Sequence, residues 1–387
     1  MKAQTFSRIE RISRPITHLL LPKSIVRIHS SGRIKFLEAL KDEIPSEPYV
    51  PPKTLETTLW NLKFRTPIGN AAGMFKNGEC SKMIEMQGAG FYLGGTGTYF
   101  PREGNTEEDI HLPVVMLPKS EAAINKLGLN NYGDEANSRQ ARFIKDTLKI
   151  PVGWSVAAPE AEDLIRNGKL KNKSDITEEQ MAGIRLEYLV KSMRLYGEAG
   201  VDFLEINESC PNTHSKIPEG SDLENRLKYV RQNFLNKRKR RLPVIVKLSN
   251  DTNLIHVPQV MDLLFELGYD GVNFGNTSTD YKTIKDSINV FERETYDYFT
   301  KTFGGGVSGD PLLEKSFDLV CKASEHLKSN PPKQEFHIIR TGGIRFMSNV
   351  ENSLDIGASL VQWYTGYFKN FRKHSHDVYR KMFKDLE

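Results

Sequence analysis

Short apolar segments alternate with amphipathic helical patterns from residue 56 onward. Most of the apolar segments are nearly continuous in apolar or small residues, which is typical of parallel strands buried on both faces. The predicted strands are eight, at residues 67–73, 90–97, 152–158, 203–209, 243–249, 271–277, 336–342 and 359–365. Helical patterns lie between them, including residues 178–199, 256–267, 312–326 and 347–356. This alternation predicts an α/β protein, a (β/α)8 TIM barrel with its active site at the carboxyl ends of the strands.

Composition limits the class of protein and its compartment. The 387 residues are 38% hydrophobic, enough for the core of one large barrel or of two ordinary domains. Three scattered cysteines, Cys80, Cys210 and Cys321, form neither a disulfide framework nor a zinc pattern. No apolar run approaches the roughly 18 residues needed to span a bilayer, and no secretory signal is evident. We therefore expect a cytoplasmic protein in a reducing compartment, with no metal site.

The N-terminal segment carries an unusual charge. Residues 1–41 hold nine Lys or Arg residues against Glu10 and Glu38, so the segment is +7 while the whole chain is +5. Apolar residues alternate with these cations, as in helices with one apolar and one basic face. Such an arm suits peripheral contact with the inner face of the cell membrane; a helix packed on its own domain is the alternative. A proline-rich linker follows at residues 43–52, which predicts an arm over 1–55 and a barrel over 56–387.

A second basic cluster occupies residues 237–241. It precedes a predicted strand directly and has no interleaved aromatic residues. Runs of this kind are most often solvated loops, so no nucleic-acid partner is expected.

The predicted strand at 203–209 continues into a distinctive run, Glu205-Ile206-Asn207-Glu208-Ser209-Cys210-Pro211-Asn212-Thr213. Asparagine and proline mark ordinary turns, and a free cysteine is often a small buried residue, so a turn beside a buried thiol is one interpretation. The other is catalytic. A thiol between two carboxamides, at the carboxyl end of a strand, is placed to move a proton from a substrate that the amides hold.

The other strand ends supply complementary groups that would converge with this thiol in a barrel. Lys76 follows the first strand, Lys247 lies in the fifth, and Asn276 and Thr277 follow the sixth. Glycines at 342–343 and the run 364–366 end the last two strands, where barrels commonly bind a phosphate through backbone N–H groups. Insertions at about 98–150 and 278–311 are expected to stand over this face.

Nine ordered motifs between about residues 60 and 368 resemble the dihydroorotate dehydrogenases, flavin enzymes of pyrimidine synthesis. The strand-end run above is one of them. The others are Asn70-Ala71-Ala72-Gly73 with Lys76-Asn77, Gly95-Thr96-Gly97-Thr98, Ile124-Asn125-Lys126-Leu127-Gly128-Leu129-Asn130-Asn131, residues 243–247, Asn276-Thr277, residues 305–312, Thr341-Gly342-Gly343-Ile344, and Leu360-Val361-Gln362-Trp363-Tyr364-Thr365-Gly366.

The resemblance implies FMN in the barrel mouth and oxidation of (S)-dihydroorotate to orotate in de novo pyrimidine (UMP) biosynthesis. In the family, a hydride passes from C6 to flavin N5 while a base removes a proton from C5, and Cys210 stands where that base belongs. The implied substrate contacts are Lys76, Asn125, Asn207, Asn212, Asn276 and Thr277. The implied FMN contacts are Ala72, Gly73, Lys76, Thr96, Ser155, Asn207, Lys247, Gly275, Gly306, Gly342, Gly343, Tyr364 and Thr365. Each carboxamide offers a donor and an acceptor, which suits a pyrimidine edge.

The electron acceptor is predicted less directly. The basic arm is similar to that of the membrane-associated, quinone-reducing branch, which favours a quinone. Cys210 instead resembles the soluble branch, which uses fumarate or NAD, whereas the quinone branch usually has serine. Other departures are an acidic stretch at 106–110, Met116 at the position of a tunnel arginine, Ser155 where the family usually has asparagine, and Gly275 where the quinone branch has threonine.

Two further alternatives remain open. One is an FMN barrel of the same architecture that acts on another pyrimidine or on an enone, although the full set of asparagines favours dihydroorotate. The other is a barrel without catalysis that serves as a binding module, although Lys76 and Cys210 are both present. Bound yellow flavin would distinguish an FMN enzyme from such a module.

Overall fold

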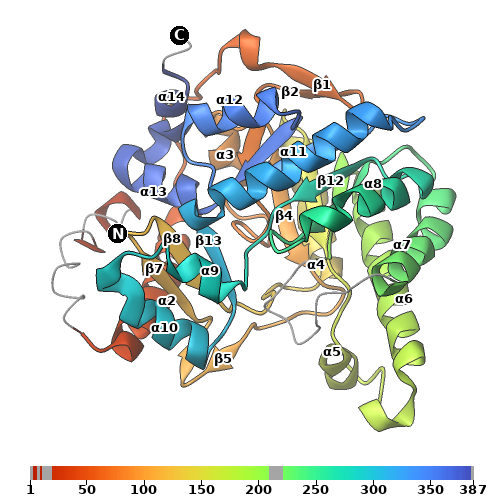
Figure 1. Ribbon diagram of the computed structural model, residues 1–387, viewed down its shortest axis with the longest axis horizontal. Coiled ribbons are helices and arrows are strands. Elements are labelled where there is room, and N and C mark those ends of the chain that lie inside the picture. The colour runs from red at the N-terminus through yellow and green to blue at the C-terminus, as the bar shows by residue number, and fades with distance from the viewer. Residues whose placement is uncertain (1–2, 7–8, 11–19, 209–220, 385–387) are drawn as a thin grey trace.

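A barrel of eight parallel strands forms the centre of the molecule (Figure 1). The computed structural model describes residues 3–6, 9–10, 20–208 and 221–384. All eight predicted strands are confirmed, and their hydrogen-bonded order is β3-β15-β14-β12-β11-β10-β9-β4. Their bounds are β3 Ile68–Asn70, β4 Tyr92–Gly97, β9 Val152–Val156, β10 Phe203–Asn207, β11 Val244–Leu248, β12 Gly271–Phe274, β14 His337–Thr341 and β15 Leu360–Trp363. The (β/α)8 prediction is therefore correct.

The side chain of Asn70 closes the seam between the two outermost strands, β3 and β4. Its Nδ2 donates to the carbonyl of Leu93 at 2.7 Å, and the Leu93 N–H donates to its Oδ1 at 3.1 Å. Backbone hydrogen bonds also cross the seam, from the Gly90 N–H to the Ile68 carbonyl at 2.9 Å and from the Gly73 N–H to the Gly95 carbonyl at 2.6 Å. A fully buried carboxamide thus takes the place of a strand partner and satisfies edge groups that would otherwise be buried unpaired.

Helices surround the barrel, as its buried strands require. The four predicted helical segments correspond to α6 Glu178–Ala199, α8 Val257–Glu266, α11 Leu313–Ser329 and α12 Met347–Asp355. The other outer helices are α3 Ser81–Gln87, α4 Asp134–Thr147, α5 Ala161–Arg166, α7 Ser221–Asn233, α13 Thr365–His374 and α14 Val378–Met382. Large side chains fill the gap between the two layers; the rings of Trp154 on β9 and Tyr196 on α6 stack with centroids 5.1 Å apart.

A hairpin covers the amino-terminal end of the barrel. Strands β1 Thr57–Leu59 and β2 Leu62–Phe64 pair antiparallel, and the Trp60 indole N–H between them donates to the carbonyl of Asp270 at 3.1 Å. Below this hairpin the barrel interior is apolar, with Leu93, Phe203, Ile245, Ile339 and Leu360 in one cluster. The closed end leaves the opposite mouth for a binding site.

The two long insertions build a small sheet at that mouth. Strands β7 Val114–Leu117, β8 Ala122–Asn125 and β13 Gly306–Gly309 pair antiparallel in the order β13-β8-β7. Hairpin β5 Thr106–Glu107 and β6 Ile110–His111, with helices α9 Tyr281–Lys285 and α10 Arg293–Thr302, completes this part. The expectation that the insertion at about 98–150 stands over this face was wrong for its last part, because α4 from this range is a barrel helix.

Helix α2, Pro22–Leu40, is the main helix in the described part of the arm. It buries Ile25 and Val26, and the Ser30 hydroxyl accepts a hydrogen bond from the Val114 N–H at 3.0 Å. Leu21 and Ile28 remain exposed, at 76% and 44%. The helix therefore packs on its own domain and still leaves apolar side chains accessible near its start, so the two interpretations of the arm are compatible. The boundary at residue 55 stays a prediction.

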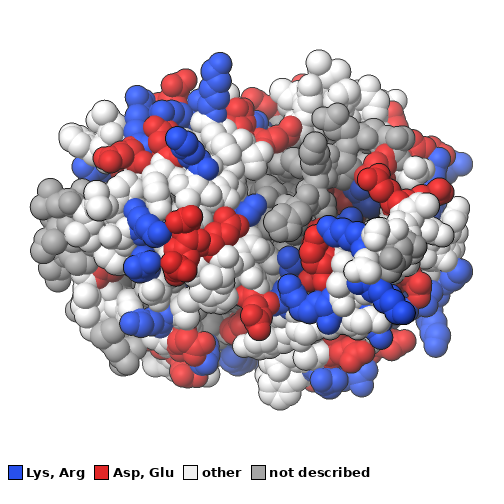
Figure 2. Space-filling view, turned by 90° about the horizontal axis from the view of Figure 1, so that it is seen from below, with Lys and Arg blue, Asp and Glu red and all other residues white. Residues whose placement is uncertain are grey.

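Charge and hydropathy over the described surface are mixed. Lys and Arg are interspersed with Asp and Glu on the face shown in Figure 2. Within the basic cluster, Arg238 and Arg241 pair with Asp270 at 3.2 and 3.6 Å, which favours a structural role for these cations. Among the helices of the described chain, none is long and apolar enough to cross a bilayer.

Candidate active site

A pocket opens at the carboxyl ends of the barrel strands, between them and the β13-β8-β7 sheet. Thirteen of the residues predicted to bind substrate or cofactor line it: Ala72, Gly73, Lys76, Thr96, Asn125, Asn207, Lys247, Asn276, Thr277, Gly342, Gly343, Tyr364 and Thr365. They come from seven barrel strands or the segments that follow them, and from β8. The structure therefore brings together residues that lie up to 293 positions apart in the sequence, between Ala72 and Thr365.

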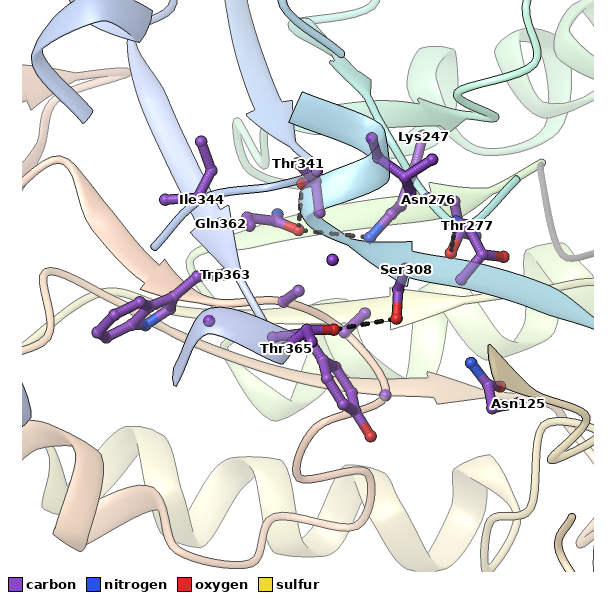
Figure 3. Close-up of a pocket in the computed structure, with 18 of the residues that line it drawn as sticks. Asn125, Lys247, Asn276, Thr277, Ser308, Thr341, Ile344, Gln362, Trp363 and Thr365 are labelled. Atoms are coloured by element: carbon purple, nitrogen blue, oxygen red, sulfur yellow. Dashed lines mark hydrogen bonds between the residues drawn. The ribbon is translucent and has the colours of Figure 1, made fainter. Parts of the chain in front are cut away.

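Lys247 forms part of the pocket floor. Its ammonium lies 3.4 Å from Oε1 of Gln362, and the Thr341 hydroxyl donates to the same oxygen at 3.1 Å; Figure 3 draws both bonds. Only 3% of the lysine side chain is exposed. Gln362 was missed as a site residue, although an amide inside the apolar run of β15 was a usable signal.

A chain of amides and hydroxyls lines one wall of the pocket. Asn276 donates to Oδ1 of Asn207 at 3.3 Å, and Asn207 donates to the hydroxyl of Thr96 at 3.0 Å. Lys76 donates to Oδ1 of Asn130 at 2.5 Å from the end of the β3 segment. Asn125 faces this group from β8, at the far side of the pocket in Figure 3. The wall therefore offers several donors and acceptors to a flat polar ring.

The opposite end of the pocket has the character of an anion site. Gly342 and Gly343 follow β14, and helix α13 begins at Thr365 with no side chain capping its N-terminus. Uncapped N–H groups at a helix start favour a phosphate. The Ser308 hydroxyl, which sequence reasoning missed, lies 3.0 Å from that of Thr365 (Figure 3). Two lysines, a wall of amides and this helix start together offer partners for a flat polar ring and for an anion.

Asp310 adds an acidic group near the phosphate end. Burial raises the pKa of its carboxyl, and the nearby Arg345 guanidinium partly opposes that effect. The two side chains pair at 2.9 Å, and Arg345 also pairs with Glu121 at 3.0 Å. Asp310 is another lining residue that sequence reasoning missed, since a carboxylate beside a phosphate site is unexpected.

Three predicted cofactor residues lie behind the lining rather than in it. Ser155 is fully buried, with its hydroxyl 3.0 Å from that of Thr96. A Cβ on Gly275 would meet the carbonyl oxygen of Thr341 at 1.5 Å, and Gly275 has a φ of +140°. A Cβ on Gly306 would meet the Thr277 hydroxyl at 2.0 Å. These residues support the wall, because any side chain at either glycine would displace a lining residue.

Cys210 and Asn212 lie outside the described residues. Of the other cysteines, Cys80 is buried immediately before α3, and burial raises the pKa of its thiol. Cys321 on α11 is only half-buried, although its place in an amphipathic helical pattern would suggest a core residue. Amphipathic helices leave residues at the edge of the buried stripe, which a sequence pattern does not separate from the core.

A second, mainly apolar cavity runs from α2 to the first pocket. The two share Asn125, Leu127, Ser308, Tyr364 and Thr365. Other lining residues include Phe6, Ile9, Ile28, His29, Gly32, Arg33, Phe36, Met116, Ala123 and Phe368. The Arg33 guanidinium donates to the Tyr364 hydroxyl at 3.1 Å, which places a cation where the two cavities meet. Met116, which stands at the position of the expected tunnel arginine, lines the same cavity and is apolar. The arm thus forms one wall of a passage that ends at the candidate active site.

Comparisons with known proteins agree with this geometry. The family model for dihydroorotate dehydrogenase matches residues 54–386. A protein from Wigglesworthia glossinidia brevipalpis, named dihydroorotate dehydrogenase (quinone), is 30% identical over 313 residues, covering 79% of this chain and 80% of that one. A protein of the same name from Pectobacterium atrosepticum is 29% identical over 336 residues, covering 85% and 84%.

Solved structures agree on the fold. Ligand-free DHODH from Eimeria tenella is 22% identical, with a TM-score of 0.71 and coverage of 92% of this chain and 93% of that one. The same enzyme in complex with ferulenol gives 21% identity and a TM-score of 0.68, with coverage of 94% and 89%. The resemblance found in the sequence motifs is confirmed by the family match, and the chain belongs to the dihydroorotate dehydrogenase family.

Proposed function

We propose that this protein oxidises (S)-dihydroorotate to orotate in de novo pyrimidine biosynthesis, with FMN as cofactor and a quinone as electron acceptor. The observation that carries the proposal is the wall of carboxamides beside two lysines. Asn125, Asn207 and Asn276 converge on one pocket with Lys76 and Lys247. Carboxamides pair with a pyrimidine edge, and the ammonium of Lys76 can pair with a substrate carboxylate.

The assignment of FMN follows from the shape and the donors of the same pocket. Lys247 would lie beside the isoalloxazine ring, and the glycines at 342–343 with Thr365 would hold the phosphate at the start of α13. When bound, FMN supplies the acceptor for the hydride that leaves C6 of the substrate. Asn207 and Thr96, joined at 3.0 Å, would fix the position of the substrate ring beside it.

Cys210 is the proposed base, on the grounds of its place in the strand-end run after Asn207. Removal of the C5 proton needs the thiolate, which an ordinary cysteine forms near pH 8.5. A nearby ammonium such as that of Lys76 would lower that value and favour the thiolate. The proton would pass from C5 to sulfur while the C6 hydrogen leaves with its electron pair.

The quinone assignment rests on the apolar cavity between α2 and the pocket. An isoprenoid quinone needs an apolar passage to the cofactor, and this cavity shares Tyr364 and Thr365 with the proposed FMN site. Arg33 at the junction could donate to a quinone carbonyl. Exposed Leu21 and Ile28 beside the arm's cations would suit contact with a membrane that holds the quinone.

An anaerobic experiment tests the first half-reaction without assuming any acceptor. L-Dihydroorotate is added to the purified yellow protein, and rapid loss of flavin absorbance is expected. Decylubiquinone, fumarate and NAD are then offered separately to the reduced protein, and only the quinone should restore the yellow colour quickly. Absence of bleaching with FMN bound would refute the substrate, and reoxidation by fumarate or NAD alone would refute the acceptor.

Two cysteine variants test the base. Cys210→Ala should retain FMN and orotate binding while flavin reduction slows by at least a hundredfold, since a positioned base contributes about that much. Cys321→Ala, which changes a half-buried thiol on α11, is the matched control and should reduce its flavin at the normal rate. Near-normal reduction in Cys210→Ala would remove that residue from the role.

A further inference from the structure

The carboxylate of Glu205 lies inside the barrel, directly below the candidate active site. Its side chain is fully buried on β10, two residues before Asn207 on the same inward face. Oε2 accepts hydrogen bonds from Nδ2 of Asn273 at 2.8 Å and from Nε2 of Gln362 at 2.9 Å. A buried carboxylate is costly unless charge and hydrogen bonds compensate it, so these two amides address only part of the requirement.

The remaining compensation comes from Lys247. Its ammonium lies 3.5 Å from Oε1 of Glu205, an oxygen with no hydrogen-bond partner in the described part of the chain. Gln362 binds both charged groups, since its Nε2 donates to Glu205 and its Oε1 accepts from Lys247. The Thr341 hydroxyl lies 2.9 Å from Oδ1 of Asn273 and 3.1 Å from Oε1 of Gln362, which links both amides.

Part of the network lines the pocket, and part is buried beneath it. Glu205 and Asn273 are fully buried, whereas Lys247, Gln362 and Thr341 line the pocket. The charge of Glu205 therefore reaches a ligand mainly through Lys247, whose position and effective charge it controls. At short range in a protein interior, a single charge of this kind interacts with another charge several times more strongly than it would in water.

We infer that Glu205 is a positioning residue that holds the Lys247 ammonium at the pocket floor and offsets its charge, and thereby sets the redox preference of the bound cofactor. The inference rests on the proposed function, because it takes FMN as the occupant. Reduced FMN carries more negative charge than oxidised FMN, so Lys247 favours the reduced form and Glu205 opposes that preference. Glu205 thus keeps the cofactor ready to pass electrons on.

The test is the midpoint potential of the FMN-loaded protein, measured by equilibration with reference dyes and without any pyrimidine. Glu205→Gln keeps the size of the side chain and one acceptor oxygen but removes the charge. The preference for reduced over oxidised FMN should rise at least tenfold, which raises the potential by about 30 mV for a two-electron couple. Asp270→Asn is the matched control, because it removes a buried carboxylate at the closed end of the barrel and should leave the potential unchanged.

A double-mutant cycle separates action through Lys247 from a direct effect on the cofactor. In a Lys247→Met background the shift caused by Glu205→Gln should fall to less than half; a full shift there would overturn the role through Lys247. A second single variant, Asn273→Ala, removes one hydrogen bond to the Glu205 carboxylate and leaves that carboxylate more dependent on Lys247. The midpoint potential of FMN in this variant should not rise, and a rise would also contradict the inference.

The outcomes distinguish this inference from the proposed function. An unchanged or lowered potential in Glu205→Gln overturns the inference, while bleaching by dihydroorotate in the same preparation leaves the proposed function standing. A raised potential without bleaching supports the inference and refutes the substrate. A protein that binds no FMN refutes both.

Discussion

Substitution of Asp134 by asparagine should stabilise the protein at alkaline pH. Asp134 is fully buried at the start of α4, where burial raises the pKa of its carboxyl from 3.8 to about 6, with hydrogen bonds from Ser192 and Tyr196 opposing the shift. The folded state therefore holds the proton more tightly than the unfolded chain. The stability that this group contributes is fully present below pH 3.8 and is lost as the pH rises through about 6.

The magnitude follows from the difference between the two pKa values. The two pKa values differ by about 2, and a difference of 1 in pKa is worth about 1.4 kcal/mol. Ionisation of Asp134 therefore lowers the stability of the folded state by about 3 kcal/mol at pH 8. Asparagine resembles the protonated acid, and its Oδ1 can still accept from the Tyr196 hydroxyl, now 2.6 Å from the carboxylate. The free energy of unfolding of Asp134→Asn should therefore exceed that of the wild type by about 3 kcal/mol at pH 8 and by little near pH 4.

Urea unfolding across pH 4–8, followed by tryptophan fluorescence, measures this difference. Trp154 stacks on Tyr196, the partner of Asp134, so its emission reports on the region. Asp146→Asn is the control, because it removes an exposed carboxylate from the same helix and should not change the pH profile of stability. Parallel profiles for Asp134→Asn and wild type, or lower stability of the variant at pH 8, would refute the reasoning.

Three other predictions follow from the barrel and its cavities. Asn70→Ala should lower the free energy of unfolding by about 2–5 kcal/mol in urea titrations, because the Leu93 N–H and carbonyl lose buried partners. Gly32→Phe should raise KM for decylubiquinone at least tenfold without slowing flavin bleaching, since a Cβ at Gly32 meets nothing within 4 Å and the residue lines the apolar cavity; Gly32→Ala is its control. The rate of flavin reduction by dihydroorotate should rise with pH toward the pKa of the Cys210 thiol, and a rate independent of pH between 6 and 9 would exclude a thiolate base.

Sequence reasoning located the strands well because buried parallel strands and amphipathic helices have different periods. Segment 178–199 was predicted to the residue. The convergence of strand ends in a barrel accounts for most of the thirteen lining residues, whereas Thr96 and Asn125 were expected only from the family resemblance. The seam was not predictable in this way. Asn70 belongs to a recognised motif, but its bond to Leu93 depends on two outer strands that meet only when the barrel closes.

The interior polar network was also invisible in the sequence. Glu205 reads as part of a strand end, and its partners Asn273 and Gln362 lie 68 and 157 residues away. Periodicity gives the face of a strand but not which strands stand opposite it, so a buried charge and its compensation are recognised only in three dimensions. The apolar cavity shows the same limit, since its walls combine α2 with β7, β8 and α13.

The vertical order of side chains in the barrel explains why one end can be stable and the other reactive. At the hairpin end the interior is an apolar layer that needs no ligand. Above it, Glu205 and Lys247 form a charge pair whose burial is costly but which two amides hold in place. Above that, Asn276 donates a hydrogen bond to Asn207 at 3.3 Å, which is longer than most hydrogen bonds between amides. A substrate ring can therefore replace that contact at little cost. The charged layer thus rigidly supports a polar layer that can exchange partners, which is the arrangement that binding and catalysis at the mouth require.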